Sequence, residues 1–354
     1  MPPAFPDKSQ IRNMLETFAF GAAGGALFFW LELPGGLISG AMIAVASAGI
    51  AGRKVGLPQA VAHVILMTLG LSLGAMVSPE LIRNVSSYPL TIALLAAATF
   101  CATFGSSLYL QRFHGWDRTS ALLAGSPGAL SQVVMLATEK NADVAGIAVV
   151  QIMRVIILTA AVPLLLAATG MMGHGPLPSR GAAATPLALI ELAVAAVAVS
   201  LLLRWLKFPA SWMFGAMLAS SVLHGTGMIH GTLPQWAYVC ALIGIGSLIG
   251  SRFGKINPRT ILSHINAALG SFVVAVAISA VFVAAIALST SVKFSDVVVA
   301  FAPGAMDAML ALALTLHIDP VFVGAHHLAR FVFVSIATPG IVHLFGKAQD
   351  DLDD

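Results

Sequence analysis

The chain has 354 residues, of which 58% are hydrophobic and 9% are charged, and its formal net charge at pH 7 is +3. A soluble domain carries roughly 25% charged residues, whereas repeated apolar runs near the length of a bilayer span indicate a polytopic membrane protein. This composition excludes a separate catalytic or DNA-binding domain, because no polar segment is long enough to form one.

The first half predicts a polar lead over residues 1–15, expected to lie in the cytoplasm, followed by six apolar segments. No small-residue cleavage pattern follows the lead, so we expect no removable signal peptide. Pro-Gly pairs or basic residues end the segments, as is typical of loops between helices. The expected segments cover residues 16–32, 37–51, 59–78, 89–110, 119–138 and 143–168.

Two of these segments carry special features. Gly70 and Gly74 in the third segment form a small-residue seam that permits close helix packing, although chance gives the same spacing in a Gly-rich chain. Ser126-Pro127-Gly128 interrupts the fifth segment. Ser before Pro is typical of an N-cap and first-turn pair, so a short helix is expected to begin there. Cys101 and Cys240 lie inside apolar runs and are expected to be small core residues.

The second half repeats the first after a linker over residues 170–184. Ser126-Pro127-Gly128-Ala129 corresponds to Ala302-Pro303-Gly304-Ala305 at an offset of 176 residues, and Arg154 corresponds to Arg330 at the same offset. The offset holds within one residue over five of the six segments, which indicates an internal duplication.

The duplication sets the expected organisation of the chain. One membrane repeat covers residues 16–169, a second covers 185–345, and an acidic cytoplasmic tail covers 346–354. We expect an all-α polytopic membrane protein with two inverted-topology repeats, about ten transmembrane helices and two re-entrant broken segments.

The distribution of Lys and Arg favours this topology. If each broken segment only dips into the bilayer, 13 basic residues fall inside and three outside. If the broken segments span, nine fall inside and seven outside. Cytoplasmic loops carry the excess of basic residues, so the first arrangement is preferred, with both termini in the cytoplasm.

Arg154 and Arg330 are the first candidate site residues. Each stands deep in the last apolar segment of its repeat, and an arginine at that depth must face protein rather than lipid. One interpretation is binding of an anionic substrate, because the guanidinium fork matches a carboxylate. The other is a structural ion pair or a cap on the carbonyls of the broken segment. The remaining substrate-binding candidates come from the breaks and the neighbouring helix turn, namely Ser126, Pro127, Gly128, Gln151, Pro303, Gly304 and Asp307.

Asp307 has no acidic counterpart, because Ser131 occupies the matching position of the first repeat. It is therefore expected to be available to Arg330, which leaves Arg154 for a substrate. Asp307, His326 and His327 are also candidates for proton coupling, while a hydrogen-bonded packing role is the alternative for the two histidines. The histidine spacing supports no metal site, and no cofactor is expected.

The motif (Leu/Phe)-Pro-x-x-x-x-x-Gly-Ala-Met occurs at Leu33 and again at Phe208. Together with the two Pro-Gly breaks and the deep arginines, it resembles the AbrB-duplication family of bacterial inner-membrane proteins, over residues 16–345. The resemblance implies the fold and the membrane location. Family members carry the labels transcriptional regulator and ammonia monooxygenase, and the family shares only a name with the soluble DNA-binding AbrB.

The sequence favours a secondary transporter or permease for a small anionic solute, and no enzyme activity is expected. The expected partners are the lipid bilayer and the small-molecule solute, with no nucleic acid, and helix seams such as the one at Gly70 are compatible with a homo-oligomer. A membrane regulatory protein that affects gene expression through a partner is the alternative, and it would need a docking surface such as the acidic tail. An ammonia monooxygenase-type enzyme is the third reading, although the sequence has no extramembrane histidine cluster for copper.

Overall fold

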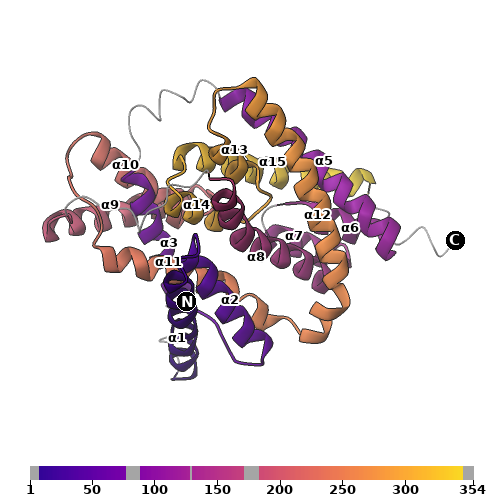
Figure 1. Ribbon diagram of the computed structural model, residues 1–354, viewed down its shortest axis with the longest axis horizontal. Helices are drawn as coiled ribbons and strands as arrows, with labels where there is room; N and C mark the ends of the chain where they lie inside the picture. The colour runs from indigo at the N-terminus through magenta and orange to yellow at the C-terminus, as the bar shows by residue number, and fades with distance from the viewer. Residues whose placement is uncertain (1–7, 77–87, 128–129, 171–182, 346–354) are drawn as a thin grey trace. The chain divides into compact units, whose positions relative to one another are not determined.

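The computed structural model describes residues 8–76, 88–127, 130–170 and 183–345, and these residues form helices with no named β-strand (Figure 1). The linker over 170–184 lies largely outside the described residues, and Gly128 and the acidic tail lie outside them entirely. The helices of the first half are α1 (Lys8–Trp30), α2 (Gly36–Ile50), α3 (Gln59–Gly74), α5 (Tyr88–His114), α6 (Arg118–Gly125), α7 (Leu130–Glu139) and α8 (Val144–Ala168). Those of the second half are α9 (Pro186–Trp205), α10 (Ser211–Gly225), α11 (Gln235–Gly250), α12 (Pro258–Ser289), α13 (Phe294–Phe301), α14 (Met306–Thr315) and α15 (Pro320–Phe345), with a short 3₁₀ helix, η2 (Phe253–Lys255), before α12.

The helix boundaries repeat with the offset seen in the sequence. α10 begins 175 residues after α2, and α11, α13, α14 and α15 begin 176 residues after α3, α6, α7 and α8. In both halves the fifth apolar segment is two short helices separated by the Pro-Gly break, as expected. α1 begins at Lys8, inside the stretch expected to be a polar lead.

Within the residues that the structure describes, five helices are long and apolar enough to cross a membrane, which indicates a membrane-type helical protein. The five are α5, α8, α9, α12 and α15. α2, α3, α11 and α14 are apolar but shorter, between 10 and 17 residues.

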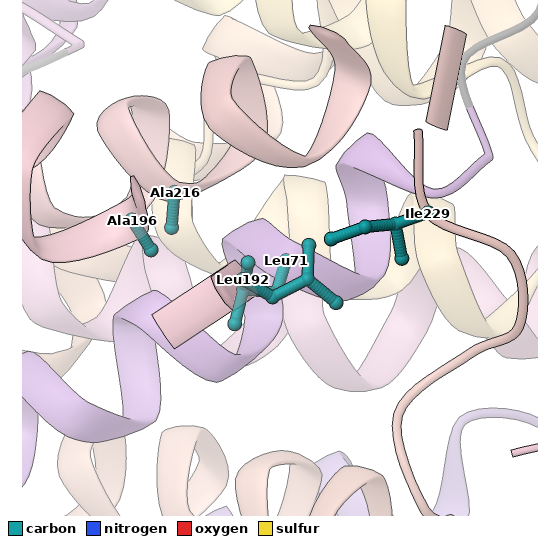
Figure 2. Close-up of a cluster of buried hydrophobic side chains, with 5 residues drawn as sticks. All are labelled: Leu71, Leu192, Ala196, Ala216 and Ile229. Carbon is teal, nitrogen blue, oxygen red and sulfur yellow. The ribbon is translucent and has the colours of Figure 1, made fainter. Parts of the chain in front are cut away.

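The helices divide into two compact units, each of which takes elements from both repeats. The first unit contains α1–α3, α9–α11, α14 and the last part of α8. In it, α2 packs against α11 and α3 packs against α10, so helices of one repeat lie against helices of the other. A buried cluster of Leu71, Leu192, Ala196, Ala216 and Ile229 joins α3, α9 and α10 to the segment after α10 (Figure 2).

Glycine seams allow these cross-repeat contacts. A Cβ at Gly70 would collide with the carbonyl oxygen of Met213, and a Cβ at Gly74 with that of Met217. Gly246 and Gly250 face the carbonyls of Ile38 and Met42 in the matching way, so both seams bring helix backbones into direct contact. The seam predicted at Gly70 and Gly74 therefore packs within the chain.

The second unit contains α5–α7, α12, α13, α15 and the first part of α8. α5 and its counterpart α12 lie against each other, and Ser106 Oγ donates to Ser271 O at 3.1 Å. Gly105 faces Ile278, whereas Tyr109, one turn later on α5, faces Gly270. Later residues of α5 therefore contact earlier residues of α12, which shows that the two helices run antiparallel.

Two local expectations were wrong. Ser126 is the C-cap of α6 rather than the N-cap of the next helix, which begins at Leu130. In the second repeat Gly304 N–H donates to Ala302 O at 2.8 Å, and this tight turn delays the start of α14 until Met306.

Cys101 and Cys240 are exposed rather than core residues, because each lies on an outward face of its helix.

We predict that Gly70→Ala destabilises the protein by about 1–3 kcal/mol, because the added methyl group must separate two backbones that cannot yield locally. The midpoint of thermal unfolding of the purified protein in detergent measures this effect. Gly225→Ala on α10 is the control, since nothing lies within 4 Å of its added Cβ. Equal midpoints for the two variants would contradict the close contact of α3 with α10.

Candidate functional site

The candidate site begins with the two short helices that precede the breaks, α6 and α13. The last carbonyl groups of a helix have no partner within it, and they form the negative end of the helix dipole. In α6 these carbonyls are buried, so another element must supply hydrogen-bond donors.

α8 supplies the donors for α6. Arg154 Nη2 donates to Ala124 O at 2.9 Å. Gln151 Nε2, one turn earlier on α8, donates to Leu123 O at 3.0 Å and lies 3.3 Å from Ser126 O. The guanidinium and the amide together cap the end of the helix at the first break.

α15 does the same for α13 in the second repeat. Arg330 Nη1 donates to Ala302 O at 2.6 Å and Nη2 donates to Ala300 O at 2.9 Å. His327 occupies the position of Gln151, and its Nε2 lies 3.1 Å from Val299 O. A carbonyl only accepts, so Nε2 carries a proton in this contact and His327 acts as a cap donor.

This geometry agrees with the capping interpretation of the arginines, yet it leaves part of each guanidinium unused. Arg154 and Arg330 are only 2% and 4% exposed, and the Nε of each has no hydrogen-bond partner among the described residues. Neither arginine forms a salt bridge within the described part of the chain. A buried charge of this kind is costly unless it is compensated, so the region favours an anion.

Both breaks meet at one narrow pocket in the second unit. Pro127 of the first break and Pro303 of the second line this pocket together with Arg330. The space is too narrow to hold a water-sized sphere, so the pocket is closed in this structure. Pro127, Pro303 and Arg330 thus line one pocket within a single compact unit.

The other break residues have local roles. Ser126 Oγ lies 3.1 Å from Thr338 Oγ1, which ties the first break to α15. Gly304 belongs to the tight turn that precedes α14.

Asp307 does not take the partner that we expected. Its Oδ2 lies 3.3 Å from Nη2 of Arg252, and the pair belongs to the first unit. Arg330 instead uses its Nη groups on the carbonyls of α13. The expectation failed because the residue that reaches Asp307 follows α11, far from it in the sequence.

His326 is fully buried and held at both ring nitrogens. Nδ1 lies 2.7 Å from Phe322 O and Nε2 lies 2.8 Å from Thr91 Oγ1. It also lies against the ring of Phe322, with a centroid distance of 4.0 Å. These contacts are those of a packed, hydrogen-bonded histidine.

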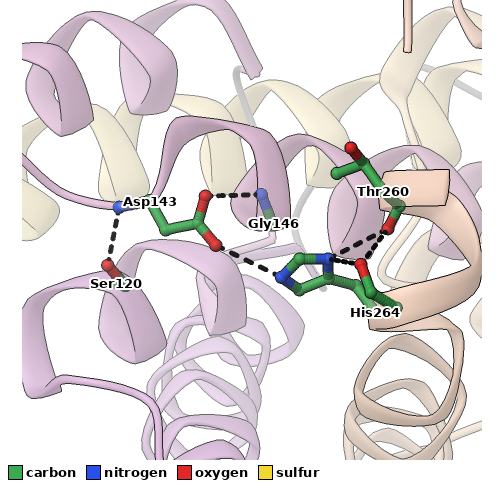
Figure 3. Close-up of polar contacts among 6 residues, drawn as sticks. Ser120, Asp143, Gly146, Thr260 and His264 are labelled. Atoms are coloured by element: carbon green, nitrogen blue, oxygen red, sulfur yellow. Dashed lines mark hydrogen bonds and ion pairs between the residues drawn. The ribbon is translucent and has the colours of Figure 1, made fainter. Parts of the chain in front are cut away.

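One polar contact was missed by the sequence reasoning. Asp143 caps α8, with Oδ1 accepting from Gly146 N–H at 3.0 Å, and its Oδ2 lies 3.3 Å from Nε2 of His264 (Figure 3). His264 Nδ1 lies 2.9 Å from Thr260 O. No sequence signal pairs these residues, because the contact depends on α12 lying beside the start of α8. Among the described residues, no group of three or more His, Cys, Asp or Glu is placed to hold a metal ion.

Comparison with known proteins gives one family and two relatives. The family described as "Transition state regulatory protein AbrB" matches residues 37–346. "Uncharacterized protein YhjN" of Bacillus subtilis (strain 168) is 27% identical over 309 residues, which cover 80% of this chain and 79% of the relative. "Putative regulator AbrB" of Escherichia coli (strain K12) is 25% identical over 322 residues, which cover 89% of this chain and 91% of the relative.

We predict that Gln151→Ala lowers stability by about 1–3 kcal/mol, because it leaves buried carbonyls of α6 without a donor. His327→Ala should have a similar effect on α13. His327→Gln should lose much less, because a glutamine already caps the matching helix in the first repeat. Thermal unfolding midpoints in detergent test all three variants, and a His327→Gln protein as unstable as His327→Ala would rule out the shared capping role.

Proposed function

The chain belongs to the family described as transition state regulatory protein AbrB, and we propose that it is a secondary transporter or permease for a small anionic solute. The observation that carries the proposal is the meeting of both helix breaks at one pocket with a buried arginine that has an unused donor. Secondary transporters place their solute at such a junction of broken helices. The site residues are those of the two breaks with Arg154, Arg330 and Gln151.

We further propose that the repeats cross the membrane in opposite directions. The antiparallel packing of α5 on α12 supports this, because these helices occupy matching places in the two repeats and each is long enough to span. The excess of Lys and Arg on one side supports the same topology. It has about ten spanning helices, two re-entrant segments and both termini in the cytoplasm of the bacterial inner membrane.

The proposed mechanism is electrostatic attraction followed by alternating access. Arg154 and Arg330 provide fixed positive charge at the breaks, and a solute anion would compensate a charge that the described residues leave unpaired. The closed pocket then corresponds to a state in which neither side has access. Movement of the elements around the breaks would open it to one side at a time.

Proton coupling belongs to the proposal at Asp307, which is the only acidic candidate among the break residues. Its ion pair with Arg252 has no counterpart in the first repeat, where Met76 and Ser131 stand at the matching positions. Protonation of Asp307 would remove the attraction and release Arg252. His326 and His327 remain candidates, although their hydrogen bonds support a packing and capping role.

The names of the family and of the Escherichia coli relative favour a second candidate, a membrane protein that affects gene expression through a partner. Its candidate docking segment, the acidic tail over 346–354, lies outside the described residues. Removing residues 347–354 separates the two functions, because a transporter should tolerate that loss and a partner-dependent regulator should not.

We predict that proteoliposomes containing the protein take up a small organic anion and that Arg154→Gln and Arg330→Gln each reduce uptake by at least about tenfold, because a buried charge partner is lost. Arg154→Lys and Arg330→Lys retain the charge and test whether misfolding explains the loss. Arg112→Gln, at the exposed end of α5, is the control. Uptake unchanged in both glutamine variants would overturn the assigned site.

We predict that Lys140→Cys is labelled only from the cytoplasmic side and Lys293→Cys only from the outside, because α6–α7 and α13–α14 enter from opposite faces of an inverted pair. Both exposed native cysteines, Cys101 and Cys240, are first replaced by Ala. A membrane-impermeant maleimide on intact cells and on inverted vesicles reports the side. Labelling of both positions from one side would contradict the inverted arrangement.

A further inference from the structure

The closed pocket at the two breaks has a definite chemical lining. Its walls are mostly apolar and include Leu95, Ala98 and Phe301. Its polar residues are Thr99, Ser279 and Arg330, and no carboxylate lines it. An apolar space with a few convergent donors is the usual form of a small-molecule site.

The two hydroxyl groups are unusual for this protein. Serine and threonine side chains in a spanning helix normally bond to a carbonyl of the preceding turn, as Thr103 Oγ1 does to Thr99 O at 2.8 Å. Within the described part of the chain, the hydroxyls of Thr99 and Ser279 make no hydrogen bond, although these residues are only 4% and 7% exposed. A hydroxyl that is not bonded within the protein can donate to a ligand, so both side chains are suited to a binding role.

The third polar group is the guanidinium of Arg330. Both of its Nη atoms are used on the carbonyls of α13, and Nε alone has no partner among the described residues. The pocket thus offers one charged donor and two neutral hydroxyls. This set matches a single carboxylate, which can accept from all three at once through its two oxygens.

The size and polarity of the walls limit the rest of the ligand. Because the pocket does not admit a water-sized sphere when closed, only a small molecule is compatible with a modest opening. A second carboxylate would be placed against apolar side chains without a donor, which is strongly unfavourable. A short hydrocarbon chain, by contrast, gains from contact with Leu95, Ala98 and Phe301.

Resting on the transport function proposed above, we propose that the solute is a short-chain monocarboxylate. Its carboxylate binds Arg330 Nε, Thr99 Oγ1 and Ser279 Oγ, and its hydrocarbon chain lies against the apolar wall. Thr99 and Ser279 thereby become specificity-determining residues of the site.

The test is equilibrium binding to the purified full-length protein in nanodiscs. The probes are formate, acetate, propionate and butyrate, compared with succinate, sulfate, phosphate and chloride. We expect at least one monocarboxylate to bind about tenfold or more tightly than succinate and each inorganic anion, because the pocket holds a single charged donor. Tighter binding of succinate or of an inorganic anion would overturn the proposal.

Hydroxyl variants test the site without removing the cap on α13. Thr99→Val and Ser279→Ala should each weaken monocarboxylate binding by about tenfold, as expected for a hydrogen bond to a charged group. Thr103→Val is the matched control, since it is equally buried on the same helix but its hydroxyl is already bonded. Unchanged binding in both hydroxyl variants would overturn the assignment.

A wall variant gives a readout that general instability cannot mimic. Ala98→Val adds two methyl groups to the pocket and should weaken butyrate more than formate, which shifts the preference toward shorter acids. An equal loss for both acids would contradict contact between the chain and this wall. If the protein takes up a different anion and none of these substitutions changes that uptake, the transport function stands and the monocarboxylate proposal is wrong. If a monocarboxylate binds but is not taken up, the binding site stands and the transport function is wrong.

Discussion

The structure of the second unit depends on how the chain satisfies helix ends that are buried at the two breaks. A helix that stops inside the protein leaves carbonyl groups without partners, and in lipid no water can supply donors. Arg154 with Gln151, and Arg330 with His327, provide those donors from the following long helix. The energetic need for the breaks to be capped thus explains why a costly charge stands so deep in each repeat.

The two halves of the chain share this arrangement at a fixed offset, and they differ in a few polar residues. The two caps are built at the same offset, but one uses an amide where the other uses an imidazole. Likewise Asp307 forms an ion pair that the first repeat cannot form. Both repeats therefore share the capping of the helix ends at the breaks, whereas some polar residues, such as Asp307, occur in one repeat only.

The balance of charge connects structure to the proposed function. The caps use Nη atoms and leave each Nε without a partner among the described residues, so the same guanidinium that stabilises a helix end retains a donor. Capping and anion binding are then compatible roles of one side chain, rather than alternatives. In the proposed function both roles meet at the closed pocket beside Arg330, because Pro127 and Pro303 of the two breaks line it.

The sequence by itself determined the helical class, the duplication, the two breaks and the depth of both arginines, because these depend on hydropathy, proline and glycine, and a fixed offset along the chain. Only the tertiary structure determined which side chains contact one another. Asp307 meets Arg252, Asp143 meets His264, and Ser126 ends a helix instead of beginning one. These contacts join residues that are distant in the sequence, or they depend on the path of a turn. Which donor bonds to which acceptor is therefore determined by the distances between side chains in the folded protein and not by the local sequence pattern.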